Sequence, residues 1–379
     1  MKNVLVLVLS NLRHDARVTR QVNWLKTKFS VTVMCFDADI EGVEIIKVKQ
    51  TQLTPFRKAA LGAALITRQY KLALSIFHDY GNTLRQLKER SWDLVVANDI
   101  DTLPMAFDVK GKGKVIFDAH EYAPRHFEDK RVWRMFFQPL YVYLCRQYLH
   151  LTDGMLTVGQ GLADEYRKEF GVNPVIITNA ASYHELTPSE ARPDKIRLIH
   201  HGIANPSRRI ELMIDMMDLL DERFTLDLIL MTSDFASGKT KAYINGLKER
   251  ATKNPRVRIL PAVKSAEVVA TITKYDMGVF IIPPINFNYA NTLPNKLFDF
   301  LQARLGIAIG PTPEMAAIVK SYDVGVVADD FTAEALAARL RNLTHEDIVR
   351  FKTNASFAAR DHNAGKNGER FNELIDRLL

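Results

Sequence analysis

The chain has 379 residues, of which 47% are hydrophobic and 25% charged, and its formal net charge is +7. This length favours two domains, and the composition is that of a globular protein without low-complexity tracts. The two cysteines, Cys35 and Cys145, exclude a disulfide framework and favour a reducing cytoplasm. A basic chain can bind nucleic acid, an anionic membrane or anionic small molecules, and charge alone does not select among them.

The first apolar run covers residues 4–10, directly after the amino-terminal lysine. It resembles the apolar part of a signal peptide, but no small-residue cleavage site follows, and it is too short to span a bilayer. We therefore expect a buried first β-strand. No run of about 18 apolar residues occurs in the sequence, so no transmembrane helix is predicted.

Short apolar runs alternate with amphipathic segments through the first half of the chain. Val18, Val22 and Leu25, for example, recur with the period of a helix. This alternation predicts a parallel sheet with helices on both faces. The expected strands are 4–10, 31–36, 44–48, 93–98, 114–119, 154–158 and 174–178.

The alternation pauses in a polar segment with two prolines and then restarts. We expect an N-terminal domain over 1–180, a linker over 181–194 and a C-terminal domain over 195–360. A helix over 361–379, capped by Asn367, could pack back on the N-terminal domain. The fold class is therefore α/β, with two Rossmann-like, doubly wound parallel-sheet domains. The strands expected in the second half are 195–200, 225–231, 256–260, 277–282, 306–310 and 324–328.

Two such sheets are expected to direct their carboxyl ends toward a central cleft, so function should lie in loops after strands. The loop after the first strand has no G-x-G-x-x-G pattern, which argues against a bound dinucleotide. Asn11 offers a polar group there, and Asp15 can cap the next helix. Arg17 and Arg20 follow in that helix, either as solvated residues or as part of a site.

The loop after the expected strand 114–119 contains Asp118, His120 and Glu121. A histidine at a strand end can donate or accept a proton, or position a hydroxyl group, and neighbouring carboxylates tune its pKa. One histidine beside two carboxylates favours a functional role over a structural one. No second histidine lies at ligand spacing, so we expect no metal site.

Arg208 and Arg209 follow the first strand of the second half and stand at the start of a helix. An arginine at such a junction can bind phosphate with its forked donors beside the positive helix end. The alternative is a pair of solvated arginines, but a cation at a helix start is electrostatically unfavourable. The position therefore favours an anionic partner.

The segment 291–303, NTLPNKLFDFLQA, begins with a polar loop and continues as a helix started by Pro294. The backbone N–H groups of such a start form an anion site. Asp299 can accept hydrogen bonds from two vicinal hydroxyls, and Asn291 can bind sugar hydroxyls. By itself the pattern favours a surface pair between Lys296 and Asp299 over an anion site.

Five motifs occur in the order and spacing of bacterial GT-B glycosyltransferases. The chain resembles the retaining, nucleotide-sugar-dependent family 4 of these enzymes, which builds cell-surface polysaccharides. The resemblance covers nearly the whole chain and is weakest between residues 50 and 90. The motifs are HDARVTRQVNWL, NDIDTLP, FDAHEYAP, HHGIANPSRRIE and LPNKLFDFLQA followed by PEMAAIV.

The resemblance implies an N-terminal domain for the acceptor and a C-terminal domain for the nucleotide sugar. Asn291 and Asp299 stand where the family has two glutamates, and Ile203 replaces its arginine after the glycine. Arg208, followed by Arg209, matches the basic residue that contacts the diphosphate, and His120 matches the active-site histidine. The implied donor-binding residues are Arg208, Arg209, Asn291, Thr292, Leu293, Asn295, Lys296 and Asp299. The implied acceptor-side residues are Asn11, Asp15, Arg17, Asp118 and Glu121.

The implied reaction transfers a sugar from a UDP-, GDP- or dTDP-sugar to an acceptor hydroxyl, with retention at the anomeric carbon and without a cofactor or metal. The acceptor would be a glycan or a lipid-linked glycan, and no nucleic-acid partner is expected. Segment 125–151 mixes basic and aromatic residues, and either contacts an anionic membrane or forms a partly buried helix. The protein would then be cytoplasmic, or peripheral at the inner face of the membrane. A nucleotide-sugar 2-epimerase and a non-catalytic subunit of a glycosyltransferase complex are the alternatives.

Overall fold

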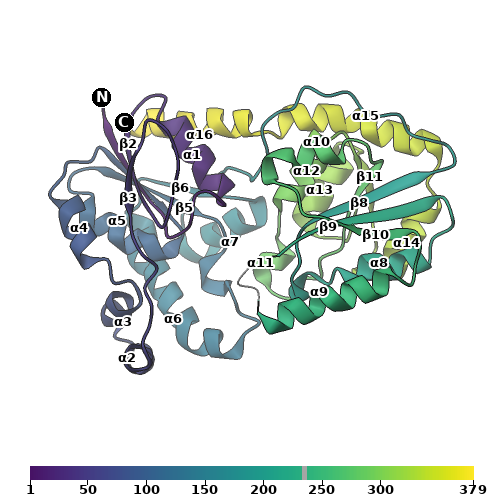
Figure 1. Ribbon diagram of the computed structural model, residues 1–379. Coiled ribbons are helices and arrows are strands. Elements are labelled where there is room, and N and C mark those ends of the chain that lie inside the picture. Colours follow the sequence, from purple (N-terminus) through teal and green to yellow (C-terminus); the bar gives the residue numbers. More distant parts are fainter. Residues whose placement is uncertain (233–236) are drawn as a thin grey trace. The chain divides into compact units, whose positions relative to one another are not determined.

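The chain folds into two compact units (Figure 1), and each unit is built from several segments of the chain. The computed structural model describes residues 1–232 and 237–379. Unit 1 consists of Met1–Thr178, Asn286–Asn288 and Gly368–Leu379, and unit 2 consists of Asn179–Ile285 and Tyr289–Asn367. Each unit contains one parallel β-sheet.

The sheet of unit 1 has seven strands in the order β3-β2-β1-β4-β5-β6-β7, and all of its neighbouring strands run parallel. Its central strands β4 and β5 are rich in apolar residues and buried along nearly their whole length, as is typical of parallel strands covered on both faces. The strand bounds are β1 Asn3–Leu7, β2 Ser30–Cys35, β3 Glu44–Lys47, β4 Leu94–Asn98, β5 Lys114–Ala119, β6 Gly154–Thr157 and β7 Val175–Ile176.

Alternate residues of β1 enter two different hydrophobic clusters, because successive side chains of a strand point to opposite faces. Val4 and Val6 pack with residues of α1 and the C-terminal helix α16, whereas Leu5 and Leu7 pack with residues of α5 and α6. Unit 1 therefore has three layers, with helices on both sides of its sheet.

Side chains accept hydrogen bonds from the first backbone N–H groups of the two leading helices of unit 1, α1 and α2. Asp15, for example, accepts the N–H of Val18 at the start of α1, as the sequence predicts. The helices are α1 Ala16–Leu25, α2 Pro55–Ile66, α3 Tyr70–Phe77, α4 Gly81–Lys88, α5 Leu103–Val109, α6 Arg131–Tyr148 and α7 Gln160–Phe170. Short 3₁₀ turns lie at η1 Ile100–Thr102, η2 Ala123–Arg125 and η3 Leu149–Leu151.

The sheet of unit 2 has six parallel strands in the order β10-β9-β8-β11-β12-β13. Gly278 in β11 lets helix α12 lie very close to this sheet, because a Cβ atom there would be 2.3 Å from the ring of Phe300. The strand bounds are β8 Ile196–Ile203, β9 Phe224–Met231, β10 Val257–Leu260, β11 Met277–Phe280, β12 Gly306–Ile309 and β13 Gly325–Val327.

Helices also cover both faces of the second sheet, where two further hydrophobic clusters form. The helices that lie in this unit are α8 Glu211–Asp218, α9 Gly238–Ala251, α10 Val268–Ile272, α12 Asn295–Gln302, α13 Pro313–Ser321, α14 Ala333–Arg341 and α15 His345–Asp361. Two helices contain residues of both units, namely α11 Phe287–Ala290 and α16 Ala364–Leu378. The 3₁₀ turns are η4 Pro206–Arg208 and η5 Ser265–Glu267.

Polar side chains of unit 2 fix the segment 181–194. Arg304 is fully buried and donates to the carbonyl oxygen of His184 at 2.6 Å. Lys352, which is also buried, donates to the hydroxyl oxygen of Ser189 at 2.9 Å. This polar segment is therefore held by hydrogen bonds at two places along its length.

The predicted fold class is confirmed, and each of the thirteen predicted strands is present within the described residues. The expectation that Asn367 caps the terminal helix is wrong, since α16 begins at Ala364. Asn363 accepts the N–H of Lys366 at 3.1 Å and so provides the cap four residues earlier. Among the described residues, no helix is both long and apolar enough to cross a bilayer.

Candidate functional site

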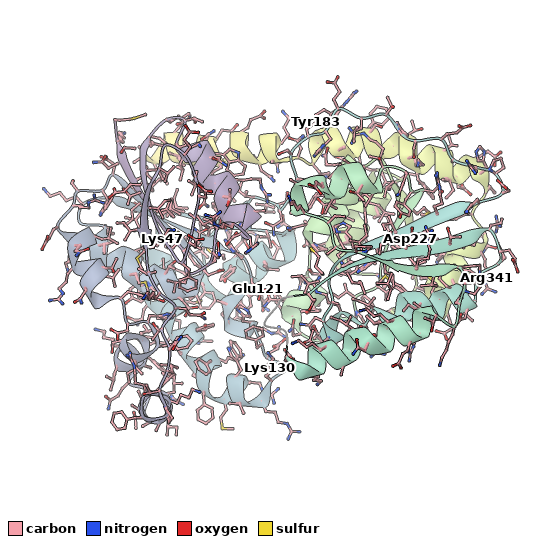
Figure 2. The ribbon with its side chains drawn as sticks, in the orientation of Figure 1. Lys47, Glu121, Lys130, Tyr183, Asp227 and Arg341 are labelled. Atoms are coloured by element: carbon pink, nitrogen blue, oxygen red, sulfur yellow. The ribbon has the colours of Figure 1, made fainter. Side chains whose placement is uncertain are left out.

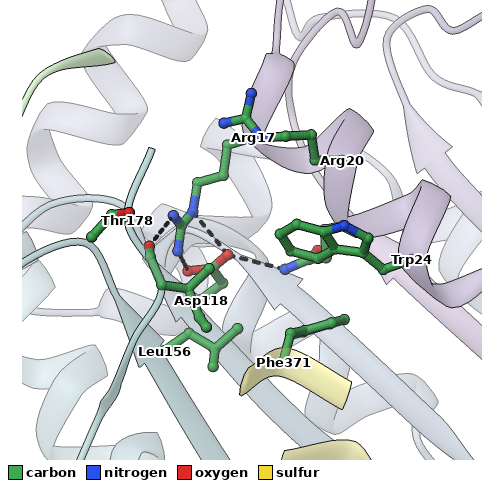
Figure 3. A pocket seen from close by; sticks show the side chains of 9 residues that line it. Arg17, Arg20, Trp24, Asp118, Leu156, Thr178 and Phe371 are labelled. Atoms are coloured by element: carbon green, nitrogen blue, oxygen red, sulfur yellow. Dashed lines mark hydrogen bonds and ion pairs between the residues drawn. The ribbon is translucent and has the colours of Figure 1, made fainter. Parts of the chain in front are cut away.

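In unit 1, the polar residues of interest lie at the carboxyl ends of β4 and β5, where Asn98 is the register partner of Asp118. The carboxylate of Asp118 accepts two hydrogen bonds from the guanidinium of Arg17, at 2.5 and 3.0 Å (Figure 3). Arg17 also donates to the carbonyl oxygen of Ile177 at 2.6 Å. Gln21 adds a further hydrogen bond to Asp118 at 3.0 Å.

This ion pair is buried, because Arg17 is 8% exposed and Asp118 is 1% exposed. The alternative that Arg17 is a solvated surface residue is therefore wrong. The cavity beside the pair has a volume of about 10 Å³, which accommodates about one water molecule rather than a sugar. The observed role of the pair is to join α1 to the end of β5 and so fix the loop that carries His120.

His120 lies next to this hydrogen-bond network, among the side chains of Asp99, Asn98 and Asp118. One ring nitrogen is 3.4 Å from the Asp99 carboxylate, and the other is 3.3 Å from the amide oxygen of Asn98 and 3.7 Å from Asp118. Burial lowers the pKa of His120, but the Asp99 and Asp118 carboxylates outweigh this effect and raise the pKa to about 9. At neutral pH the ring is therefore a charged hydrogen-bond donor.

The other predicted acceptor-side residues lie in the two loops that follow β1 and β5. Asn11 accepts the backbone N–H of Arg13 at 3.0 Å and so stabilises a turn. Asp15 accepts from the Ser10 hydroxyl in addition to capping α1. Glu121 (Figure 2) is 3.0 Å from the ring of His126. Asn11 and Asp15 are thus engaged in local structure, whereas Glu121 belongs to the same loop as His120.

In unit 2, a buried cation lies at the carboxyl end of β8. Lys296, on the first turn of α12, is 4% exposed, and its ammonium lies 3.8 Å from the centre of the Phe280 ring. His200 donates its Nδ1–H to the carbonyl oxygen of Val279 at 2.9 Å, so its Nε2 can accept from Lys296 at 3.3 Å. The predicted surface pair of Lys296 with Asp299 is therefore wrong.

Gly202, in strand β8, lies against the ammonium of Lys296. Its φ of +137° suits glycine, and a Cβ atom there would be 3.1 Å from the Lys296 ammonium nitrogen. No carboxylate in the described part of the chain lies within ion-pair distance of Lys296. Burial and then the charge of Arg208 lower the pKa of Lys296 well below its usual value, and Asp299 opposes this only in part. The free site therefore disfavours the positive charge of Lys296, and an anion bound there would stabilise it.

The two predicted arginines of this loop differ in their contacts. Arg209 has a left-handed backbone, with a φ of 47°, and forms an ion pair with Glu211 at 2.5 Å. Arg208 ends the η4 turn and forms no ion pair with any described residue. Both arginines precede α8, which begins at Glu211, so the expectation that they stand at the start of this helix is wrong. Arg208 is the arginine available to an anion.

Asp299 lies one turn after Lys296 on α12, and its carboxylate is 3.5 Å from Nε2 of His201. That nitrogen has no hydrogen-bond partner, although the residue is only 5% exposed. Burial, followed by the charge of Lys296, lowers the pKa of His201 to about 3, so its ring is neutral at physiological pH. A neutral imidazole thus lies beside the carboxylate that is predicted to bind ribose.

The remaining predicted donor residues form the loop before α12 and the first position of that helix. Asn291 and Thr292 are partly buried, and Asn295 is exposed. Leu293 is 6% exposed and packs in the hydrophobic core, so only its backbone can face a ligand. No side chain in the described chain caps the first N–H groups of α12, which therefore remain available to an anion.

Sequence reasoning missed His200, His201 and Phe280 in unit 2, and Gln21 and Asn98 in unit 1. The two histidines directly precede Gly202 at the end of a predicted strand, and this position in the sequence could have identified them as candidate site residues. Gln21 and Asn98 gave no such signal, because they lie 77 residues apart and bind each other at 3.1 Å only in the folded chain. Among the described residues, no three His, Cys, Asp or Glu side chains are arranged to hold a metal ion.

No protein-family model and no curated protein sequence matches this chain. Solved structures do match it. HepE from Anabaena, in complex with UDP and glucose, has a TM-score of 0.70 at 14% identity, and the match covers 99% of this chain and 100% of HepE. WaaG, a glycosyltransferase involved in lipopolysaccharide biosynthesis, has a TM-score of 0.65 at 14% identity and coverages of 98% and 99%.

TarM from S. aureus, in complex with UDP, has a TM-score of 0.61 at 12% identity. That match covers 80% of this chain, which spans only 58% of TarM. At such identities the likeness establishes the fold, and the chain therefore has the GT-B fold.

Proposed function

We propose that this chain is a retaining glycosyltransferase that transfers a sugar from a nucleoside diphosphate sugar to an acceptor hydroxyl. The observation that carries the proposal is the buried ammonium of Lys296. It lies beneath Gly202 and close to Arg208, without a carboxylate within ion-pair distance in the described part of the chain. A buried cation without a counter-ion is unfavourable unless an anion binds beside it. A diphosphate is an anion of the required charge.

The diphosphate would be bound by three kinds of donor. Lys296 supplies an ammonium, Arg208 supplies a forked guanidinium, and the start of α12 supplies backbone N–H groups. Asp299 would accept hydrogen bonds from the two ribose hydroxyls, and Asn291 would bind the sugar. HepE and TarM were both solved with UDP. This supports a UDP-sugar as the first donor to test, ahead of GDP- and dTDP-sugars.

In the proposed reaction, the bond between the anomeric carbon and the diphosphate oxygen breaks, and the acceptor oxygen bonds to that carbon from the same face. The acceptor proton passes to an oxygen of the leaving diphosphate. Lys296, Arg208 and the start of α12 stabilise the negative charge that develops on the leaving group. His120, protonated at neutral pH, orients the acceptor or the transferred sugar by donating a hydrogen bond.

The proposed acceptor is a glycan or a lipid-linked glycan of the cell envelope, and the proposed location is the cytoplasmic side of a membrane. WaaG, which matches nearly the whole chain, is involved in lipopolysaccharide biosynthesis. Unit 1 would hold the acceptor, as the family resemblance implies. An acceptor attached to a lipid would require the protein to work at a membrane surface.

A second candidate function is that of a non-catalytic subunit in a glycosyltransferase complex. The observation that favours it is the replacement of the expected carboxylate and arginine by Asn291 and Ile203. The purified chain should be screened by thermal shift against nucleotide sugars, because a ligand of the folded state raises its melting temperature. Release of nucleotide with transfer to an added glycan supports the enzyme. Release of nucleotide and free sugar without an acceptor supports a 2-epimerase, and neither binding nor turnover supports the subunit.

A further inference from the structure

Helices α2, α3 and the first turns of α6 form one side of unit 1, which we call the basic–apolar face. Helix α2 contacts both α3 and α6, and all three labels lie together at the lower edge of this unit in Figure 1. The rings of Tyr70 and Tyr143 join α3 to α6, with their centres 4.8 Å apart. The residues of the face are Phe56, Lys58, Ile66, Arg68, Lys71, Leu72, Lys130, Arg131, Val132, Arg134 and Met135.

Helix α2 is apolar on two sides. Its inner side buries Leu61, Ala64 and Leu65 in the core of unit 1. Its outer side exposes Phe56 and Ile66, which are 83% and 67% exposed, together with two alanines. A helix that only covers a core normally places polar residues on its outer side. The outer side of α2 therefore has the composition of a contact surface.

The first part of α6 continues this pattern. Val132 and Met135 are 66% and 64% exposed, and they are three positions apart, so they lie on the same side of the helix. The second half of α6 is different, because Leu140 and Leu144 are buried. The expected partly buried helix is thus present in segment 125–151, with an exposed beginning and a buried end, and membrane contact stays a prediction.

The charge of this region has one sign. Residues 45–78 contain six Lys and Arg residues and no Asp or Glu, and residues 130–152 contain four Lys and Arg residues and no Asp or Glu. These ten positive charges exceed the formal net charge of +7, so the rest of the chain is net acidic by three. Six of these ten residues belong to the face, namely Lys58, Arg68, Lys71, Lys130, Arg131 and Arg134.

Most of the cations on the face are not neutralised by the protein. Lys58, Arg68, Lys71 and Arg131 are exposed and form no ion pair with any described residue. Arg57, at the edge of the same helix, does pair with Asp79 at 2.8 Å. A surface with exposed apolar side chains and unneutralised cations is complementary to a surface with an apolar interior and anionic groups.

A second copy of the chain is a poor occupant for this face. In a symmetric dimer the same patch lies on both subunits, so its cations would face those of the partner. Like charges across an interface are repulsive and would oppose the apolar contact. The charge pattern instead favours an occupant that is anionic and apolar at once.

We propose that the basic–apolar face docks on an anionic lipid bilayer. Phe56, Ile66, Val132 and Met135 enter the boundary between headgroups and acyl chains, while the lysines and arginines bind the headgroups. Lys130 (Figure 2), at the start of α6, belongs to the headgroup contacts. The inference extends the proposed location of the enzyme at a membrane and rests on that part of the proposed function alone.

The test is co-sedimentation of the purified protein with vesicles of phosphatidylcholine, with or without phosphatidylglycerol. We expect binding only to the anionic vesicles, weakened by salt. The double variant Phe56→Ser and Ile66→Ser should bind about tenfold more weakly for each side chain removed. Changing Lys58, Arg68 and Lys71 to Gln should weaken binding about fivefold for each charge.

The matched control is the double variant Val349→Ser and Phe357→Ser, which changes two exposed apolar residues of α15 outside the face. It should bind vesicles like the wild type. UDP binding by calorimetry and the melting temperature should be unchanged in every variant, so failure of the membrane inference is separable from failure of the proposed donor site. Equal binding to neutral vesicles, equal binding by the Phe56 and Ile66 variant, or a concentration-dependent dimer that this variant abolishes would each overturn the inference.

Discussion

Replacing Lys296 with Met should separate nucleotide binding from folding. The ammonium accounts for a buried positive charge whose observed contacts are His200 and the Phe280 ring. Burying such a charge without a carboxylate is costly, and methionine keeps most of the length and the contact with the ring. We expect the free energy of unfolding without ligand to change by less than about 1 kcal/mol, or to rise.

The same substitution should weaken the binding of UDP strongly. A hydrogen bond to a charged group contributes about 1.5–3 kcal/mol, so the dissociation constant for UDP should rise roughly tenfold to a hundredfold. Titration calorimetry measures the affinity, and thermal or urea unfolding without ligand measures the stability. An unchanged affinity for UDP would refute the assignment of Lys296 to the diphosphate.

Lys352 provides the matched control, because it is the same residue type, equally buried and in the same unit. Its ammonium donates to Ser189 and to the carbonyl oxygen of Tyr275 and lies 3.6 Å from Asp276. Lys352→Met should therefore lower stability by roughly 3 kcal/mol and leave UDP affinity unchanged. If both variants lose stability equally, Lys296 is a structural cation and the reasoning fails.

The depressed pKa of Lys296 adds a pH signature to this prediction. Burial and Arg208 lower that pKa in the free protein, and a bound diphosphate should raise it again. UDP binding should therefore take up protons, and affinity should fall as pH rises through the depressed value. Calorimetry in buffers of different ionisation enthalpy detects this uptake, which Lys296→Met should abolish.

Three further changes test the other assignments. Asp299→Ala should raise the dissociation constant for UDP roughly tenfold to a hundredfold. An unchanged dissociation constant by calorimetry would contradict the assignment of Asp299 to the ribose hydroxyls. Arg208→Ala should lower kcat about a hundredfold, with Arg209→Ala as the control that stays near wild type; a normal rate would remove Arg208 from the site. Asp99→Asn should lower the pKa of His120 from about 9, measured by NMR titration. The stability that the His120–Asp99 pair gives the folded state is fully present below a pH of about 6.5 and is lost as the pH rises through about 9. The variant should therefore flatten this pH dependence of the free energy of unfolding.

The fold could be predicted from the sequence because its signals are local. Each buried parallel strand is a short apolar run, such as Leu94–Asn98, and the amphipathic segments between strands predict the covering helices. The ends of elements were less predictable. We predicted that Asn367 caps the terminal helix, whereas the backbone N–H of Lys366 donates to Asn363, four residues earlier in the chain.

The candidate sites could be located but not described from the sequence. Strand ends pointed to His120 and Asp299, because loops after parallel strands carry function. Burial could not be predicted in the same way, since it depends on partners distant in the chain. Arg17 is buried by Asp118, which follows 101 residues later, and Lys296 by His200, which lies 96 residues earlier. Charged residues on helices therefore looked like surface residues.

The hydrogen bonds that hold segment 181–194 have a consequence for dividing the protein into fragments. The segment is polar and contains prolines, so it looks like a site for limited proteolysis, but His184 and Ser189 are bonded to buried Arg304 and Lys352. Proteases need an unfolded stretch, so this one should resist cleavage while unit 2 stays folded. A cut at Thr178 would preserve these bonds. The same cut would leave Gly368–Leu379 on the C-terminal fragment, although this segment belongs to unit 1. The N-terminal fragment would then expose the apolar face that this segment covers.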